Sequence, residues 1–359
     1  MNEVIVVGSG LAGLVAARQN VLQGRTVRVL DTASRAGASA LSAQIAGVTL
    51  DVGTLYLDPF DTALADVVDR SGQSPGLVPS EPKRWWLATP TGTLPLPEMH
   101  VVGVPAAPLA AETIAIVGRR AAWRGMLDAV MPGPRGSKAS TLGELVRARL
   151  GVGITDSLVA PVVRALTGSA LDELSPTDID GLRHLMLQQN SLTRAVTQLR
   201  LDDAGHHRLT AIAGGPSTLV TALLAELDTY GVPIELGVDR ESLDMVRDDA
   251  DSVIETHDRP RGAIATLVLD GSQVPAGRRG AGVLAGHSTG APVRRVLDLS
   301  SLWPSLYGQD PSLTLLRVES DSELTVDEAI EIVARWWDSA GVNAAVKGAY
   351  LMRDDDVNP

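Results

Sequence analysis

The first thirty residues combine short apolar runs with a helical pattern of apolar positions. Residues 4–7 are a continuous β-branched run, which is typical of a strand buried in a parallel sheet. Residues 11–22 repeat apolar side chains at helical spacing, and Gly24 predicts where this helix ends. Residues 26–30 predict a second strand with Asp31 at its end. The order strand, helix, strand predicts a βαβ unit.

The turn between the first strand and the helix has the dinucleotide-binding pattern G-x-G-x-x-G. It comprises Gly8, Ser9, Gly10, Leu11, Ala12 and Gly13. The pattern predicts that Gly8 permits a tight turn, Gly10 lets the backbone approach a pyrophosphate, and Gly13 lets the helix pack on the strand. Backbone N–H groups at the helix start would bind the phosphates, and Asp31 would accept hydrogen bonds from the adenosine ribose. The alternative is a glycine-rich turn that binds no ligand.

The rest of the chain predicts a helical region followed by a mainly antiparallel sheet. Residues 110–131 and 142–201 are rich in helix formers, with a capping-box sequence at 140–144. Residues 324–340 predict a further helix, and an acidic tail is expected from Tyr350 onward. Apolar runs typical of strands lie at residues 263–269, 282–285, 293–300 and 312–318. The expected fold class is α/β.

Composition and charge exclude several kinds of function. The chain of 359 residues has 31 Lys plus Arg against 43 Asp plus Glu, a net charge of −12. Such a surface repels nucleic acid, and an anionic substrate would need a local basic anchor. The absence of cysteine excludes disulfides, thiolate metal sites and a cysteinyl link to a flavin. No metal-ligand spacing is found, and His206 and His207 lie in a polar segment where solvation is expected.

The segment after the second strand resembles the FAD-dependent amine oxidase superfamily. Asp31, Thr32, Arg35 and Gly37 match its acid–x–x–x–Arg–x–Gly–Gly continuation, with Ala38 in place of the second glycine. The resemblance implies FAD as the cofactor, with the arginine near its ribose and phosphates and the glycine beside the flavin. An NAD-dependent dehydrogenase is the weaker alternative, because this continuation belongs to FAD proteins.

Further segments resemble the same superfamily. Residues 50–53 match a strand near the flavin that carries an acid two residues before a glycine. Gly214 and Gly215 match the glycine pair that opens the helix returning to the cofactor domain. Val238 falls where the family's backbone contacts the adenine. The resemblance therefore implies one cofactor site assembled from distant parts of the chain.

Residues 83–97 resemble the protoporphyrinogen and coproporphyrinogen oxidase branch, in which a basic-aromatic strand precedes a Leu-Pro turn. The resemblance implies that Arg84 anchors a propionate of a tetrapyrrole, and the guanidinium fork suits a carboxylate. The alternative is a surface arginine that covers Trp85.

The same branch implies that a helical insert contacts a membrane surface. The candidate face comprises Arg119, Arg120, Trp123 and Arg124. The alternative is a basic helix end packed beside a buried tryptophan. No apolar run is long enough to cross a bilayer, and the first strand follows no signal-peptide pattern. The expected location is cytoplasmic, with peripheral membrane contact.

The resemblance also implies the order of the domains: a Rossmann-like FAD-binding domain, an antiparallel-sheet substrate domain and a helical insert. The expected segments are 1–82 for the first part of the FAD-binding domain, 83–105 for substrate-domain strands, 106–205 for the helical insert, 206–260 for the return to the FAD-binding domain, and 261–359 for the substrate domain. The sequence ends before the family's final FAD-binding segment is reached.

The function that the resemblance implies is dehydrogenation of a porphyrinogen-like substrate with oxygen as acceptor. No catalytic residue is predicted, because the flavin carries the chemistry and the protein positions the substrate. Two alternatives stay open. One is a shortened homologue without catalysis, acting as a pseudo-enzyme or a partner-dependent subunit. The other is an amine-oxidase-like flavoenzyme of secondary metabolism.

Overall fold

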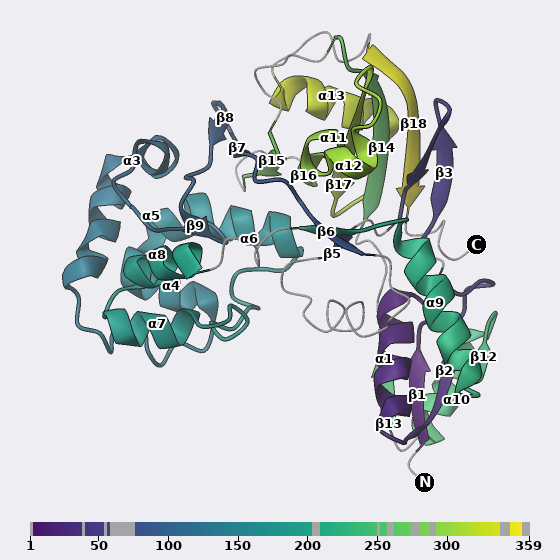
Figure 1. Ribbon diagram of the computed structural model, residues 1–359. Helices are drawn as coiled ribbons and strands as arrows, with labels where there is room; N and C mark the ends of the chain where they lie inside the picture. The colour runs from purple at the N-terminus through teal and green to yellow at the C-terminus, as the bar shows by residue number, and fades with distance from the viewer. Residues whose placement is uncertain are drawn as a thin grey trace.

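The computed structural model describes residues 3–37, 40–53, 56–57, 76–202, 209–249, 252–256, 262–273, 280–286, 292–337 and 345–353. Figure 1 shows three parts: a small sheet with α1, α9 and α10, a larger sheet with α11, α12 and α13, and a group of helices that includes α3 to α8. The predicted α/β class is confirmed. Ala38, His206 and His207 lie outside the described residues.

The small sheet is parallel and contains the predicted βαβ unit. Its strands are β1 (Glu3–Val7), β2 (Thr26–Leu30), β12 (Ile234–Glu235) and β13 (Ser252–Glu255), in the order β12-β2-β1-β13. β1 and β2 confirm the first two predicted strands, and the helix between them spans the predicted residues. The chain therefore leaves the sheet after β2 and returns to it only with β12 and β13.

Helices cover both faces of the parallel sheet. They are α1 (Leu11–Leu22), α9 (Pro216–Thr229) and α10 (Arg240–Asp249). Side chains alternate between the faces of a strand, so Val4 and Val6 pack with α1 and α9. Ile5 points to the opposite face and packs with Leu243 of α10. The sequence pattern did not predict α10, although this helix completes the layer.

The larger sheet has seven strands and is mainly antiparallel, as predicted. The strands are β7 (Trp85–Thr89), β8 (Gly92–Pro95), β14 (Ala263–Asp270), β15 (Gly282–Ala285), β16 (Val293–Asp298), β17 (Leu313–Ser320) and β18 (Val346–Arg353). Their order is β18-β14-β17-β16-β15-β7-β8, and among these neighbours β15 and β7 are parallel. The acidic tail expected from Tyr350 is wrong for residues 350–353, because they pair with β14.

Adjacent residues of β17 show how this sheet is covered on both faces. The covering helices are α11 (Leu299–Leu302), α12 (Pro304–Tyr307) and α13 (Val326–Trp336). Leu316 packs with Trp336 of α13, whereas its neighbour Leu315 packs with Trp303 beside α12. The predicted strand over 293–300 ends at Asp298, whose side chain accepts a hydrogen bond from Ser301 N–H and caps α11.

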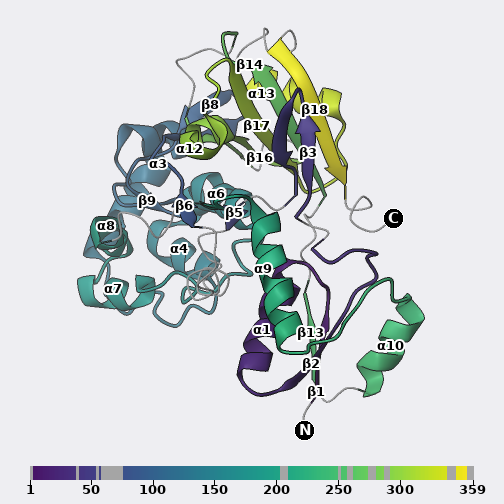
Figure 2. The same cartoon turned by 45° about the vertical axis from the view of Figure 1, so that its right-hand side comes forward.

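Two small sheets connect the larger parts. The hairpin of β3 (Ser42–Ile45) and β4 (Val48–Asp51) lies beside β18, as Figure 2 shows. The second is antiparallel and contains β5 (Tyr56–Leu57), β6 (Leu77–Pro79) and β11 (Thr210–Ile212). Ala211 packs in the core beside the larger sheet and Ile212 in the core of the parallel sheet. β11 therefore joins the two cores.

The insert is a helical bundle preceded by a short hairpin. Its elements are β9 (His100–Val101), β10 (Val104–Pro105), α3 (Ala111–Met126), the 3₁₀ turn η1 (Leu127–Val130), α4 (Leu142–Leu150), α5 (Val152–Ile154), the π-helical turn η2 (Thr155–Val159), α6 (Ala160–Thr167), α7 (Leu182–Gln189) and α8 (Leu192–Asp202). The predicted capping box is confirmed at Thr141 and Glu144. The predicted helix over 110–131 is interrupted, because Gly118 has φ +79° and ψ +158°.

A buried ion pair ties the insert together. Arg149 of α4 and Asp128 of η1 are both 0% exposed, and the Arg149 Nε lies 2.5 Å from Asp128 Oδ1. Their side chains also form hydrogen bonds with Pro132, Asn190, Ser191, Leu192 and Thr193. The pair thus links η1 and α4 to the start of α8, with both charges compensated.

Candidate functional site

The glycines of the N-terminal turn are required by close backbone contacts. Gly8 has φ +110°, and a Cβ there would lie 2.6 Å from Thr256 Oγ1. A Cβ on Gly13 would lie 1.8 Å from the Gly8 carbonyl oxygen, so only glycine lets α1 approach the turn this closely. Gly10 precedes α1 with φ −71° and ψ −175° and contributes no side-chain cap. The first turn of α1 therefore keeps the backbone geometry of an anion site.

The acid at the end of β2 is joined to this turn. The Asp31 carboxylate accepts hydrogen bonds from the Ser9 N–H and the Ser9 hydroxyl, both at 2.6 Å, and from Ala33 N–H at 2.9 Å. Val238 N–H donates to the Asp31 carbonyl at 3.0 Å. The structure thus brings Ser9, Asp31 and Val238 together, as a site for the adenosine half of a dinucleotide requires.

The remaining candidate cofactor residues lie around the same turn. Gly37 has φ +68°, and its N–H donates to the Ser9 carbonyl at 2.9 Å. A Cβ on Gly37 would lie 2.4 Å from Val220 Cγ1, so this glycine also lets the segment pack on α9. Leu11 is buried in the core of the parallel sheet, Thr32 is half-buried, and Ala12 and Arg35 are exposed. Their cofactor contacts stay predictions.

A second pair of sequence landmarks meets at the start of α9. A Cβ on Gly215 would lie 2.2 Å from Asp51 Oδ2, so the carboxylate of β4 lies against the N-terminus of that helix. Burial raises the pKa of Asp51, while the Ser42 hydrogen bond and the nearby Arg317 charge oppose this rise. Burial, together with the Asp51 charge, also raises the pKa of Tyr307. Asp51 and Gly215, which belong to two different sequence landmarks, are therefore neighbours in the fold.

Arg317 connects the larger sheet to the chain that leaves β4. Its Nε donates to Glu319 at 2.9 Å, and its Nη2 donates to the Gly53 carbonyl at 2.6 Å. Arg295 donates to the other oxygen of Glu319 at 2.9 Å. All three side chains are at most 5% exposed. This buried group fixes β16 and β17 against the segment that follows the β3–β4 hairpin.

A cavity of about 420 Å³ lies where the larger sheet meets the helical insert. Its apolar walls are formed by Trp85, Leu96, Val162, Leu166, Leu209 and Leu284. Its charged and ionisable side chains are the basic Lys83, Arg84, His100 and Arg200 and the acidic Glu81 and Glu98. Cavities of this size bind small molecules, with apolar walls and a few polar groups that fix orientation.

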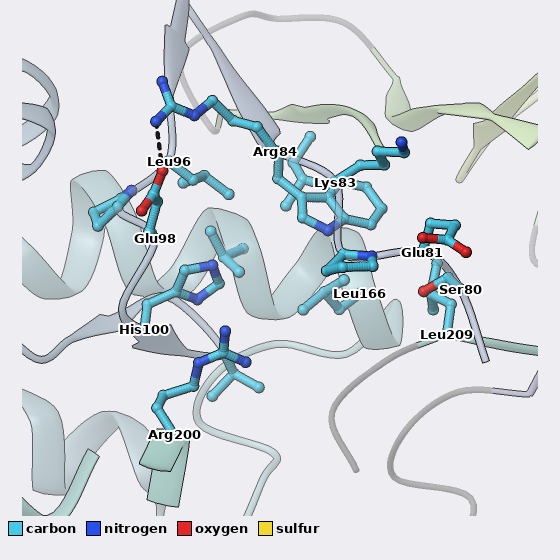
Figure 3. Close-up of a pocket in the computed structure, with 16 residues that line it drawn as sticks. Ser80, Glu81, Lys83, Arg84, Leu96, Glu98, His100, Leu166, Arg200 and Leu209 are labelled. Atoms are coloured by element: carbon cyan, nitrogen blue, oxygen red, sulfur yellow. Dashed lines mark hydrogen bonds and ion pairs between the residues drawn. The ribbon is translucent and has the colours of Figure 1, made fainter. Parts of the chain in front are cut away.

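Arg84 reaches this cavity at its rim. Figure 3 shows its guanidinium extended toward Glu98, and the Arg84 Nη2 lies 2.7 Å from Glu98 Oε1. The side chains are 44% and 74% exposed, respectively. Arg84 is thus placed to meet a ligand that enters the cavity, but it already has an acidic partner.

Sequence reasoning missed a second arginine of the cavity. Arg200 lies in the last turn of α8 and points toward His100 in Figure 3. Its Nε is buried and has no hydrogen-bond partner among the described residues. No motif surrounds Arg200 in the sequence, so only the packing of α8 beside β9 could reveal it.

The candidate membrane face is partly exposed. Trp123 is 64% exposed, so the alternative of a buried tryptophan is wrong. Arg119 and Arg120 are exposed, but Arg124 donates hydrogen bonds to the carbonyls of Ala148 and Arg149. In the part of the chain that the structure describes, no helix is long and apolar enough to cross a membrane. Contact of this face with a membrane surface stays a prediction.

Among the described residues, no group of three or more His, Asp or Glu side chains is arranged to hold a metal ion. The candidate site residues lie at the N-terminal turn, at the start of α9 and in the cavity.

Comparisons with known proteins agree with this architecture. Residues 6–71 match the NAD(P)-binding Rossmann-like domain family. Putrescine oxidase of Kocuria rosea is 43% identical over 70 residues, which are 20% of this chain and 15% of that protein. Coproporphyrinogen III oxidase of Propionibacterium freudenreichii is 25% identical over 173 residues, 48% of this chain and 33% of that protein. The matched stretches thus span a third or less of both curated relatives.

The fold comparison covers nearly the whole chain. The crystal structure of a putative protoporphyrinogen oxidase from Exiguobacterium has a TM-score of 0.73, covering 98% of this chain and 86% of that one at 16% identity. At this identity the likeness establishes the fold. The chain has the fold of FAD-dependent oxidoreductases, with a Rossmann-like domain at its N-terminus. The cofactor that this class implies is FAD.

Proposed function

We propose that the chain is an FAD-dependent oxidoreductase that dehydrogenates an anionic, largely apolar substrate of the porphyrinogen type, with dioxygen as the final electron acceptor. One observation carries the choice of substrate: the cavity combines apolar walls with three permanent cations, Lys83, Arg84 and Arg200, against two acids. Carboxylate side chains of a tetrapyrrole match these cations, and its pyrrole rings match the apolar walls.

The residues of the N-terminal turn fit the adenosine and pyrophosphate parts of FAD. Gly8, Gly10 and Gly13 keep the backbone open beside the start of α1, and Asp31 offers carboxylate oxygens at the end of β2. Arg35 is exposed nearby, in reach of solvent and ligand. When bound, FAD supplies the capacity to accept a hydride. The protein's own contribution is to hold, orient and desolvate the reactants.

The cavity disfavours the amine alternative. Amine substrates such as diamines are cations at neutral pH, and the three permanent cations outnumber the two acids around the cavity. Glu98, one of these two acids, is already paired with Arg84. A cationic substrate would meet uncompensated positive charge there, whereas a carboxylate would be attracted.

A flavin-reduction assay tests the proposed activity. Protein reconstituted with FAD is mixed without oxygen with a porphyrinogen or with putrescine, and the visible flavin absorbance is followed. We expect the porphyrinogen to bleach the flavin and air to restore it. Bleaching by putrescine alone would assign an amine oxidase. Stable FAD binding without bleaching by either compound would assign the non-catalytic alternative.

The ion pair at the cavity rim gives a second test. We expect Arg84→Ala to raise KM for a porphyrinogen about three- to tenfold with a smaller change in kcat, because a charge-assisted contact is lost. Glu98→Gln releases Arg84 from its partner and is expected to lower KM. An unchanged KM in both variants would return Arg84 to a surface residue that covers Trp85.

A further inference from the structure

The guanidinium of the half-buried Arg200 differs from those of the fully buried Arg149, Arg295 and Arg317. Arg149 donates to Asp128, and Arg295 and Arg317 share Glu319. The buried Nε of Arg200, by contrast, has no hydrogen-bond partner among the described residues. Leaving a buried N–H donor such as this Nε unpaired is costly, so such an atom is expected where a ligand completes its hydrogen bonds.

The neighbour of Arg200 in the cavity does not compensate its charge. Gly103 N–H donates to His100 Nδ1 at 3.1 Å, so the neutral imidazole carries its proton on Nε2. Figure 3 shows Arg200 pointing toward this ring, while Glu98 lies farther along the cavity beside Arg84. The Arg200 guanidinium therefore gives this end of the cavity positive charge, which suits an anion.

The other walls of the cavity are apolar. Val162 and Leu166 come from the helix over 160–167, and Leu284 comes from β15. Trp85 adds an aromatic side chain from the first residue of β7. A ligand that fills the cavity therefore needs an apolar body as well as an anionic end.

We propose that Arg200 is the principal anion anchor of this cavity and binds one carboxylate of an otherwise apolar ligand through the guanidinium fork. Arg84 at the rim is then a secondary contact, because a ligand must compete with Glu98 for it. The identity of the ligand as the substrate rests on the proposed function, but its binding requires neither FAD nor turnover. Arg200 is thus the residue that selects an acid over a neutral or cationic compound.

Direct binding of a fluorescent acid tests the proposal. The probe is dansylaminoundecanoate, and its methyl ester has the same apolar body without the charge. We expect wild-type protein to bind the acid at least about tenfold more tightly than the ester, because a charge-assisted bidentate contact is added. Equal affinities of wild-type protein for the acid and the ester would overturn the proposal.

Variants on α8 make the test specific. Arg200→Met keeps an apolar side chain of similar length and is expected to weaken the acid about tenfold while leaving the ester unchanged. Arg194→Met is the matched control, because Arg194 is exposed on the same helix and the change in net charge is equal. Equal loss of acid and ester in Arg200→Met would assign Arg200 to the cavity wall and overturn the proposal.

A conservative variant covers the case in which Arg200→Met does not fold. Arg200→Lys keeps the charge but not the planar fork, so we expect weaker binding of the acid and unchanged binding of the ester. Unchanged acid binding in Arg200→Lys would overturn the bidentate contact. Selective acid binding in protein whose flavin no porphyrinogen bleaches would retain the anion site and refute the proposed activity. Bleaching of the flavin by a porphyrinogen, without selective binding of the acid, would retain the proposed activity and refute the anion site.

Discussion

Gly10→Val is expected to abolish FAD binding while leaving the unliganded protein folded. The backbone of Gly10 has φ −71° and ψ −175°, which valine adopts readily, so the turn itself tolerates the substitution. The added side chain would stand at the start of α1, where the pyrophosphate must approach the backbone. FAD at one hundred times its Kd stabilises a folded protein by about 2.7 kcal/mol, and this gain is expected to vanish in the variant.

Thermal unfolding with and without FAD measures this effect. The unliganded wild type and the Gly10→Val variant are expected to melt at similar temperatures, whereas only the wild type shifts with FAD. Gly10→Ala, with a single added methyl group, is expected to retain part of the shift. An FAD affinity of Gly10→Val equal to that of the wild type would contradict the assignment of this turn to the pyrophosphate.

Arg149→Met is expected to destabilise the helical insert more than any exposed charge substitution. Removal of one member of a fully buried ion pair costs about 3–5 kcal/mol, because the other charge stays buried without a partner. Asp128 would be that charge, at 0% exposure. Urea unfolding measures the loss in the free energy of unfolding, and limited proteolysis shows whether the insert opens first.

Arg147→Met on the same helix is the control for this substitution. Arg147 pairs with Asp172, but the two side chains are 36% and 54% exposed. Exposed pairs contribute about 0–1 kcal/mol, so the expected loss is small. A cost for Arg147→Met as large as that for Arg149→Met would show that burial is not what makes the Arg149 pair important.

The parts of the fold that the sequence predicted well are those decided by local patterns. β1, α1 and β2 agree with prediction to within a residue, because a β-branched run, a glycine turn and a helical repeat lie within thirty residues. The capping box at Thr141 is likewise decided over four residues. In each case the residues that make up the sequence pattern also form the hydrogen bonds of the local structure.

The parts that sequence reasoning missed depend on contacts between distant residues. Residues 350–353 of β18 were assigned to an acidic tail because only pairing with β14, about eighty residues earlier, makes Tyr350 part of a strand. The cofactor turn was found, but the unpaired Nε of Arg200 depends on how α8 lies beside β9 and β10. A sequence motif cannot show that a side chain lacks a hydrogen-bond partner, because the fold decides which groups meet.

Arg317 has a mechanical consequence for how ligands enter and leave. Its guanidinium spans from β17 to the Gly53 carbonyl, and its carboxylate partner is itself nearly inaccessible to solvent. A hinge motion that separated the larger sheet from the β3–β4 hairpin would break these bonds and leave the Arg317 charge without its partners. We therefore expect exchange by small local displacements at the cavity rim, with the segment that follows the β3–β4 hairpin staying fixed to the larger sheet.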